Sequence, residues 1–420
     1  MYKKFFLGSE KGLAARTFFW TAASGTVYAL SSFIFLAVIT HVLGDTISDI
    51  FSIGLMIAQQ VLTVGKFSVR NYQVSDIKEK YSFSQYLGFR LVTCLIMLVI
   101  TAGWIIFGGY RGDTAIVIVC MTVYKLAECI SDVFEGLYQQ KFRFDVSGKS
   151  QFFKNLIMII TFVAMIIISR NLVLSSVVLA VESMVLILVV DVPLTKFFDR
   201  LGLDFKIKKM WGIAVACFSL FVSSFLYVYI NNSPKYAISD MGGDSALTHF
   251  NALFMPVFAV DLLAGFTMRM WLTKMTVYHE EGNYRQFKKM IWKQCGIIAL
   301  ITLAAMAGMY FLGGFILSLI YGIDLSGYEW TNALLMLSGG LVAVYTLFEN
   351  VIIIYRKQHF SIVINIISAL AAVFIVPACT RYDGIMGASV GYLAVNAIRA
   401  LGYYFTALFY MLKGKKKQQG

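Results

Sequence analysis

The feature that most constrains this chain is a series of apolar runs, each long enough to cross a lipid bilayer as a helix. About 20 residues are needed, because a helix rises about 1.5 Å per residue and the hydrocarbon core is about 30 Å thick. A first set lies near residues 17–40, 46–65, 86–108, 114–138, 152–169 and 173–192. A second set lies near residues 210–230, 247–270, 292–312, 331–354, 361–379 and 385–411. The sequence therefore predicts an all-α integral membrane protein with about 12 transmembrane helices.

Composition supports this class. Of the 420 residues, 59% are hydrophobic and only 14% are charged, and the mean hydropathy is +0.74. A water-soluble domain of this size would carry far more Lys, Glu and Asp on its surface. The six cysteines lie in or beside apolar runs without metal or redox spacing, so they read as small buried residues. We expect neither a metal site nor a cofactor.

The basic residues indicate the orientation in the membrane. With the N-terminus inside, the cytoplasmic segments hold 30 of the 36 Lys and Arg. The outer connections hold four, which are Arg111, Arg170, Lys235 and Arg381. Since Lys and Arg collect in cytoplasmic loops, this predicts that both termini are cytoplasmic. The same scatter explains the net charge of +13 without nucleic acid, which we do not expect as a partner.

The two sets of runs are nearly equal in length and meet at the basic loop Thr195–Lys209. This predicts an N-terminal lobe of residues 1–200 and a C-terminal lobe of residues 201–420 around a central cavity. The longest outer connection, near residues 231–246, contains Asn231 and Pro234, which are typical of a turn. No loop exceeds about twenty residues, too few for a separate catalytic domain. We therefore do not expect an enzyme.

Four ionisable residues in the run near 114–138 share one face of the expected helix. Lys125, Glu128, Asp132 and Glu135 follow one another at spacings of three, four and three. An ionisable side chain near the middle of a bilayer costs about 2.5 to 3.5 kcal/mol on insertion scales. This face is therefore expected to look into the protein and away from lipid.

Other apolar runs carry polar residues of the same kind. Expected cavity-lining polar residues are Thr21, Ser24, Tyr28, Gln59, Tyr392 and Asn396. Arg399 continues the stripe of Tyr392 and Asn396 along the last run, and Glu182, Asp261 and Glu349 are single acids in three other runs.

Two interpretations of these charges stay open. In the first, they neutralise one another between helices, Lys125 with Glu128 and Arg399 with one of the single acids. In the second, they line a wet cavity where a cation holds an anionic head group and an acid takes up an ion. The second is favoured for the set as a whole, and its ion-coupling candidates are Glu128, Asp132, Glu182, Asp261 and Glu349.

Cations also gather at the expected cytoplasmic ends of the helices. They are Arg16, Arg90, Lys154, Arg269, Lys274 and Lys293. Anchoring to anionic lipid explains most such residues. The alternative is that they attract a phosphate group to the cytoplasmic side of the cavity.

Four short sequence segments accompany the twelve apolar runs. They are Ala23–Tyr28, Ile130–Gln139, Tyr278–Asn283 and Tyr382–Ser389. With this layout over the whole chain, the sequence resembles the lipid-linked oligosaccharide repeat-unit flippases of bacterial O-antigen and capsular polysaccharide synthesis. These belong to the multidrug/oligosaccharidyl-lipid/polysaccharide (MOP) exporter superfamily.

The resemblance implies two six-helix lobes around a cavity that opens alternately to either side. The implied substrate is an undecaprenyl-pyrophosphate-linked oligosaccharide, moved from the inner to the outer leaflet of the bacterial cytoplasmic membrane. It also implies cavity cations for the pyrophosphate, here Lys125 and Arg399, with Arg16, Arg90 and Arg269 as further candidates. The resemblance further implies contact with membrane lipids and coupling to H+ or Na+. It also implies a monomeric protein that associates with polysaccharide polymerase machinery. The departure is that acids outnumber the two central bases.

Two other classes remain as alternatives. A multidrug extruder of the same superfamily, exchanging organic cations for H+ or Na+, would suit an acidic lumen. An enzyme such as a membrane polysaccharide polymerase or ligase is the third reading, but a polymerase of that kind needs a sizeable outer loop bearing Arg or His.

Overall fold

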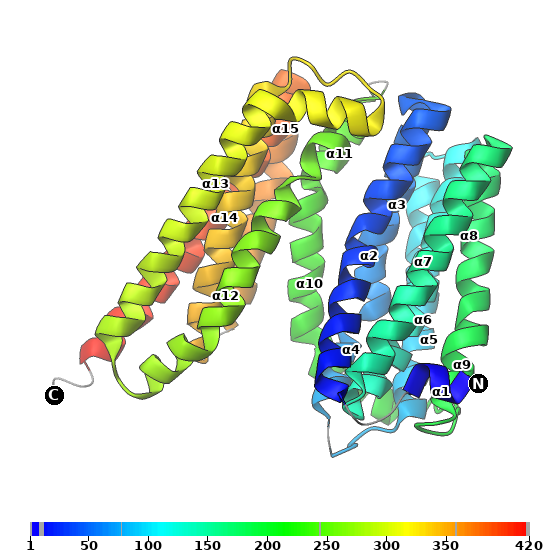
Figure 1. The fold of residues 1–420 in the computed structure, drawn as a ribbon, viewed down its shortest axis with the longest axis horizontal. Coiled ribbons are helices and arrows are strands. Elements are labelled where there is room, and N and C mark those ends of the chain that lie inside the picture. The colour runs from blue at the N-terminus through cyan, green and yellow to red at the C-terminus, as the bar shows by residue number, and fades with distance from the viewer. Residues whose placement is uncertain (1, 8–11, 77, 243–244, 358, 417–420) are drawn as a thin grey trace. The chain divides into compact units, whose positions relative to one another are not determined.

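The computed structural model describes residues 2–7, 12–76, 78–242, 245–357 and 359–416, apart from some side chains within the helices. Every regular element in this described part is helical (Figure 1). Packing divides the chain into unit 1, Met1–Val228, and unit 2, Tyr229–Gly420. The division falls inside helix α10 (Ile207–Met241), and the expected lobe boundary at residue 200 stays a prediction.

Unit 1 is a bundle of long helices joined by short connections. Its elements before α10 are α1 (Tyr2–Leu7), α2 (Leu13–Leu43), α3 (Asp45–Lys66), α4 (Val69–Ser75), α5 (Phe83–Phe107), α6 (Gly112–Gln140), α7 (Phe144–Ser169), α8 (Leu172–Leu186), η1 (Ile187–Asp191) and α9 (Val192–Thr195). Helix α2 packs along α7, and α6 packs against both α3 and α8. Helix α6 therefore lies inside the bundle, which suits its polar stripe.

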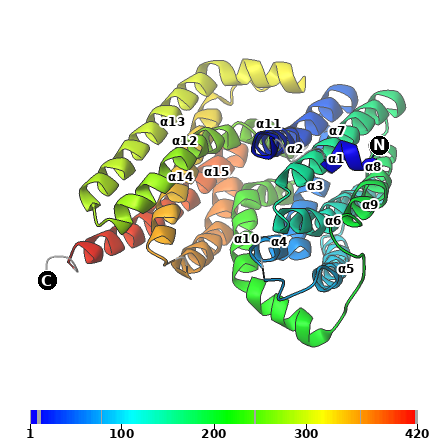
Figure 2. The same cartoon turned by 60° about the horizontal axis from the view of Figure 1, so that its bottom comes forward.

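Unit 2 is a second helical bundle. Its elements after α10 are α11 (Ala246–Phe254), α12 (Val257–Glu280), α13 (Tyr284–Tyr321), α14 (Glu329–Ile354) and α15 (His359–Lys416). Helix α14 packs against α12, α13 and α15 and is the central element of this unit (Figure 2).

The surface is that of a membrane protein, with large apolar side chains exposed on it and several charged side chains buried inside. Phe107 is 93% exposed and Ile168 is 79% exposed, whereas Arg90 is fully buried and Arg399 is 1% exposed. Ten helical segments of the described part are long and apolar enough to cross a bilayer. The prediction of an all-α membrane protein is confirmed. The count of twelve spans and the cytoplasmic position of both termini stay predictions.

Helix α15 holds the last two expected runs, 361–379 and 385–411, with a break between them. Asp383 and Gly384 leave helical geometry there, and Gly384 has φ +47° and ψ −126°. Gly387 lies just beyond the break, where an added Cβ would be 1.9 Å from the carbonyl oxygen of Cys379. Only glycine allows the backbone on the two sides of the break to approach so closely.

The expected turn near residues 231–246 was wrong over its first half, because α10 continues as a helix to Met241. Asn231 and Asn232 are buried within unit 2, and the hydroxyl of Tyr392 donates to Asn231 Oδ1 at 2.9 Å. Lys235, assigned above to an outer loop, lies on this helix with its Nζ 5.1 Å from the ring centre of Phe254. A buried partner for Asn231 outweighs the turn preference of an Asn-rich segment.

Helix α8 changes to a wide π turn at η1 before α9. The N–H of Val192 donates to the carbonyl of Ile187, five residues back, just ahead of Pro193, which has no N–H to donate. The wide turn ends at Asp191, which is fully buried. It is thus placed within the bundle at the end of a membrane helix.

The connection from α9 to α10 is fastened to the start of α5. The N–H of Asp204 donates to the carbonyl of Ser84 at 3.1 Å, and Gln85 Nε2 donates to Asp204 Oδ2 at 3.0 Å. Gly88 lies against the same strap, since an added Cβ would be 2.5 Å from the carbonyl oxygen of Asp204. The segment between the two sets of helices is therefore an ordered part of unit 1.

Candidate functional site

The polar face of α6 is buried inside unit 1, as its spacing predicts. Lys125, Asp132 and Glu135 are each at most 7% exposed, and the side chain of Glu128 is 18% exposed. All four meet oppositely charged side chains.

Glu128 gathers three donors from three helices. Lys66, at the end of α3, donates to Glu128 Oε1 at 2.7 Å, and Tyr28 of α2 donates to the same oxygen at 2.9 Å. Lys125 donates to Oε2 at 2.7 Å, and its Nζ also lies 4.7 Å from the ring centre of Tyr124. Lys125 and Glu128 therefore neutralise each other, as the first interpretation of the sequence proposed.

Asp132 and Glu135 share a second group of cations. Arg90 of α5 donates to Asp132 Oδ2 at 2.9 Å and to the carbonyl of Gly65 at 2.5 Å. Arg70 of α4 donates to Asp132 Oδ1 at 3.2 Å and to Glu135 Oε2 at 2.8 Å. Arg90, expected to lie at a cytoplasmic helix end, is thus an interior residue that joins α5 to α6.

Asp191, at the π turn, forms the third group. Lys154 of α7 donates to its two carboxylate oxygens at 2.8 and 3.1 Å, and Ser131 and Ser150 donate at 2.7 and 3.1 Å. Lys154 Nζ also lies 3.6 Å from Glu135 Oε1, which connects this group to the previous one.

These contacts form two groups, one around Glu128 and one that joins Asp132, Glu135 and Asp191, which together we call the unit 1 charge network. It comprises the cations Lys66, Arg70, Arg90, Lys125 and Lys154 and the acids Glu128, Asp132, Glu135 and Asp191. Five cations against four acids leave an excess of one positive charge when all are ionised. Its two most exposed side chains are cations, Lys66 at 31% and Arg70 at 25%. The network therefore presents positive charge where it is most accessible.

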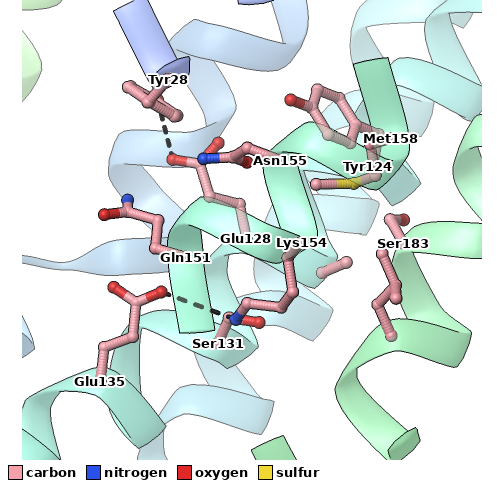
Figure 3. Close-up of a pocket in the computed structure, with 12 residues that line it drawn as sticks. Tyr28, Tyr124, Glu128, Ser131, Glu135, Gln151, Lys154, Asn155, Met158 and Ser183 are labelled. Carbon is pink, nitrogen blue, oxygen red and sulfur yellow. Dashed lines mark hydrogen bonds and ion pairs between the residues drawn. The ribbon is translucent and has the colours of Figure 1, made fainter. Parts of the chain in front are cut away.

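A cavity lies beside the network, between α2, α6, α7 and α8. Its empty volume is about 410 Å³, part of which is open to solvent. The side chains around it include Tyr28, Glu128, Glu135, Lys154, Asn155 and Ser183. In Figure 3, Tyr28 reaches Glu128, and Lys154 reaches Glu135. We call this space the unit 1 cavity.

Unit 2 holds a smaller polar group around Arg399 on α15. Arg399 donates through Nε to Asn365 Oδ1 at 3.0 Å and lies 4.0 Å from the ring centre of Tyr345. Tyr403, one turn along α15, donates to Glu349 Oε1 of α14 at 3.1 Å. The single acid Glu349 and Arg399 are thus brought to one cluster through Tyr403 and Asn365.

No protein-family model matches the sequence. The chain is 23% identical over 397 residues to the capsular polysaccharide biosynthesis protein CapF of Staphylococcus aureus, covering 93% of this chain and 98% of CapF. The structure matches the lipid II flippase MurJ in an inward closed conformation with a TM-score of 0.72 at 13% identity, over 96% of this chain and 89% of MurJ.

A multidrug resistance MATE family transporter of the MOP superfamily, in an inward-facing conformation, matches with a TM-score of 0.64 at 13% identity, over 93% of this chain and 95% of that one. The chain has the fold of the MOP superfamily. The resemblance to this superfamily expected from the sequence is thereby confirmed, and the chain is a multi-pass membrane protein with this transporter fold.

Within this MOP fold, the remaining predicted residues of unit 1 lie in mixed surroundings. Ser24 is buried and donates to the carbonyl of Thr21, whose own side chain is exposed. Gln59 is half-buried. Glu182 of α8 is half-buried and accepts from Thr161 of α7 at 2.9 Å. Arg16 lies 3.5 Å from Asp145 at the start of α7. Of the predicted lining residues of unit 1, the cavity includes Tyr28.

In unit 2, Tyr392 and Asn396 are buried on α15, and Asn396 Nδ2 donates to the carbonyl of Tyr392 at 2.9 Å. The side chains of Asp261 and Arg269 lie outside the described residues. Their roles, and those of the other predicted site residues, stay proposals.

Sequence reasoning missed three members of the charge network. Lys66 and Arg70 follow an apolar run, where positive-inside anchoring was a sufficient explanation, and Asp191 precedes a proline at the end of another run. No helical spacing marks Lys66 and Arg70, because α3 ends at Lys66 and α4 begins at Val69, with Phe67 and Ser68 in left-handed geometry between them. Among the residues whose structure is described, no group of His, Cys, Asp and Glu is arranged to hold a metal ion.

Proposed function

We propose that this protein is a flippase that moves undecaprenyl-pyrophosphate-linked oligosaccharide repeat units from the inner to the outer leaflet of the bacterial cytoplasmic membrane by alternating access. The observation that carries the proposal is the match to a capsular polysaccharide biosynthesis protein over 93% of this chain and 98% of that one. The shared fold with a lipid II flippase supports the same class of cargo.

The charge network supports an anionic cargo. Two unit charges of opposite sign attract each other strongly across a low-dielectric interior, so an excess positive charge favours the approach of a phosphate group. Lys66 and Arg70 are the accessible cations of the network, and Lys125 lies behind them on α6. Arg399 supplies a buried cation in unit 2. Arg16, Arg90 and Arg269 complete the proposed set of pyrophosphate-attracting cations.

The multidrug extruder is the second candidate, because a multidrug resistance transporter shares the fold. The charge balance of the unit 1 charge network counts against it, since Glu128, Asp132 and Glu135 of α6 are each already paired with a cation and the network has one positive charge in excess. A polymerase or ligase is the third candidate. It differs from the proposed flippase because it would form a covalent bond, whereas the proposed transport requires no covalent step.

The deciding experiment is deletion of the gene in its native host. We expect lipid-linked oligosaccharide to accumulate on the inner leaflet and surface polysaccharide to fall, with recovery on complementation. Drug sensitivity with normal surface polysaccharide would reject the flippase and favour the extruder. Lipid-linked repeat units that reach the outer leaflet but are not polymerised would favour the enzyme.

A further inference from the structure

The wall of the unit 1 cavity is largely apolar but includes two carboxylates, and these carry little unbalanced charge. Glu128 is held by two lysines, and Glu135 is held by Arg70 at 2.8 Å and Lys154 at 3.6 Å. A paired carboxylate still has free lone pairs, since each oxygen can accept more than one hydrogen bond. The cavity therefore offers hydrogen-bond acceptors without attracting a bare cation.

The cavity also holds a donor that lacks an acceptor. Asn155 of α7 lines it and is 7% exposed, and its buried Nδ2 has no hydrogen-bond partner. Buried polar groups are nearly always hydrogen-bonded, so an unpaired amide at the wall of a cavity indicates a missing acceptor. Figure 3 shows Asn155 and Glu128 among the side chains around the same space.

The other side chains that line the cavity indicate which class of ligand it could bind. Tyr28 and Tyr124 supply aromatic rings, and Gln151 and Ser183 supply further polar groups. Paired carboxylates, an amide donor and flat apolar rings together complement a ring that bears several hydroxyls.

We propose that the unit 1 cavity binds a sugar ring of the lipid-linked repeat unit, with Asn155 donating to one hydroxyl or ring substituent and Glu128 and Glu135 accepting from others. This rests on the proposed flippase function and adds a subsite to it. In this proposal the cavity binds the glycan, and the cations of the unit 1 charge network bind the pyrophosphate.

The test measures binding to the full-length protein in lipid nanodiscs with two probes. One is undecaprenyl pyrophosphate, and the other is the undecaprenyl-pyrophosphate-linked repeat unit extracted from the native host. We expect the wild type to bind the sugar-bearing lipid more tightly. Asn155→Leu should lower affinity for that lipid about tenfold, which is the scale of one lost hydrogen bond, and leave affinity for the bare lipid unchanged.

Two further variants separate this effect from general damage. Ser183→Leu fills the cavity from α8, where the Ser183 hydroxyl bonds only to the carbonyl of Ala180 in its own helix, so the same selective loss is expected. Asn350→Leu is the matched control, because the Asn350 amide bonds to its own helix in unit 2 and does not line this cavity. It should bind both lipids as the wild type does.

The outcomes are distinct. An unchanged preference for the sugar-bearing lipid in both Asn155→Leu and Ser183→Leu overturns the subsite and leaves the flippase intact. Equal losses for both lipids also overturn it, since the cavity would then act on the carrier and not on the sugar. If the wild type binds neither lipid, the proposed function fails and the subsite with it.

Discussion

At the scale of single residues, Glu128 holds three helices together, because it is the acceptor for Tyr28, Lys66 and Lys125. One carboxylate thereby ties α2 and α3 to α6. Removing one partner of a buried ion pair leaves the other charge uncompensated, which is costlier than removing both.

Glu128→Gln should therefore destabilise the protein by about 3 to 5 kcal/mol, since two lysines lose their counter-charge. The double variant Lys125→Met with Glu128→Gln should regain part of that loss. Thermal unfolding in nanodiscs measures both. A double variant that is less stable than Glu128→Gln would contradict this account of the pair.

The cations themselves are expected to act on transport. Lys125→Ala and Arg399→Ala should each impair glycan export while the protein stays in the membrane, because both remove a buried cation proposed to meet pyrophosphate. Surface polysaccharide is measured at matched expression, with Arg111→Ala as a control at an exposed position. Normal surface polysaccharide from both variants would end the claim that these residues bind substrate.

At the scale of elements, the interruptions of the helices depend on particular residues, as the helices themselves do. The break in α15 depends on a glycine that touches backbone, and α8 ends in a π turn that carries Asp191 into the network. In α15 the regular helix is interrupted where two backbone segments pack closely. In α8 it is interrupted where a charged residue is buried.

Gly387→Ala tests the α15 break. Its Cβ would meet the Cys379 carbonyl oxygen at 1.9 Å, so the backbone must shift, and we expect a loss of about 1 to 3 kcal/mol. Gly296→Ala in α13 is the matched control, because nothing lies within 4 Å of its added Cβ. It should be neutral or stabilising by up to about 1 kcal/mol. Equal thermal stability of the two variants would refute the close approach.

The helices were predictable because an apolar run of bilayer length must satisfy its own backbone hydrogen bonds in lipid, and a helix does this within one segment. The α6 stripe was predictable because Lys125, Glu128 and Glu135 follow the helical period. Asn231 was misplaced, since a turn-forming residue can equally be a buried partner, here for Tyr392. The contacts of Asp191 depend on α6 and α7 in three dimensions, which no local spacing encodes.

At the scale of the whole molecule, alternating access requires an energy source. Two of the predicted coupling acids, Glu128 and Asp132, are held by cations. Glu182 accepts from Thr161 and is half-buried, so it is the acid of unit 1 best placed to exchange an ion. The proposal of coupling to H+ or Na+ thus concentrates on Glu182 in this unit.

Collapse of the ion gradient should slow translocation of the lipid-linked repeat unit in proteoliposomes. Separate ionophores for H+ and Na+ identify the ion, and Glu182→Gln should weaken the response to that ion. Transport that continues unchanged after both gradients are abolished would reject coupling.

The strap between α9 and α10 should respond to acid. Hydrogen bonds from Gln85 and then from Lys206 hold the pKa of Asp204 below its ordinary value of about 4. A lowered carboxyl pKa stabilises the folded strap above the ordinary value, and this contribution is lost as the pH falls through the lowered one. The hydrogen-exchange protection factors of residues 201–206, which are corrected for the slower intrinsic exchange in acid, should therefore fall at low pH, and much less change is expected in Asp204→Asn.

The two sets of membrane helices are joined by a single segment that is attached to α5 by one backbone hydrogen bond and by one carboxylate that acid would protonate. A protease active in acid should accordingly cut the chain there first, releasing two fragments that each retain their own membrane helices.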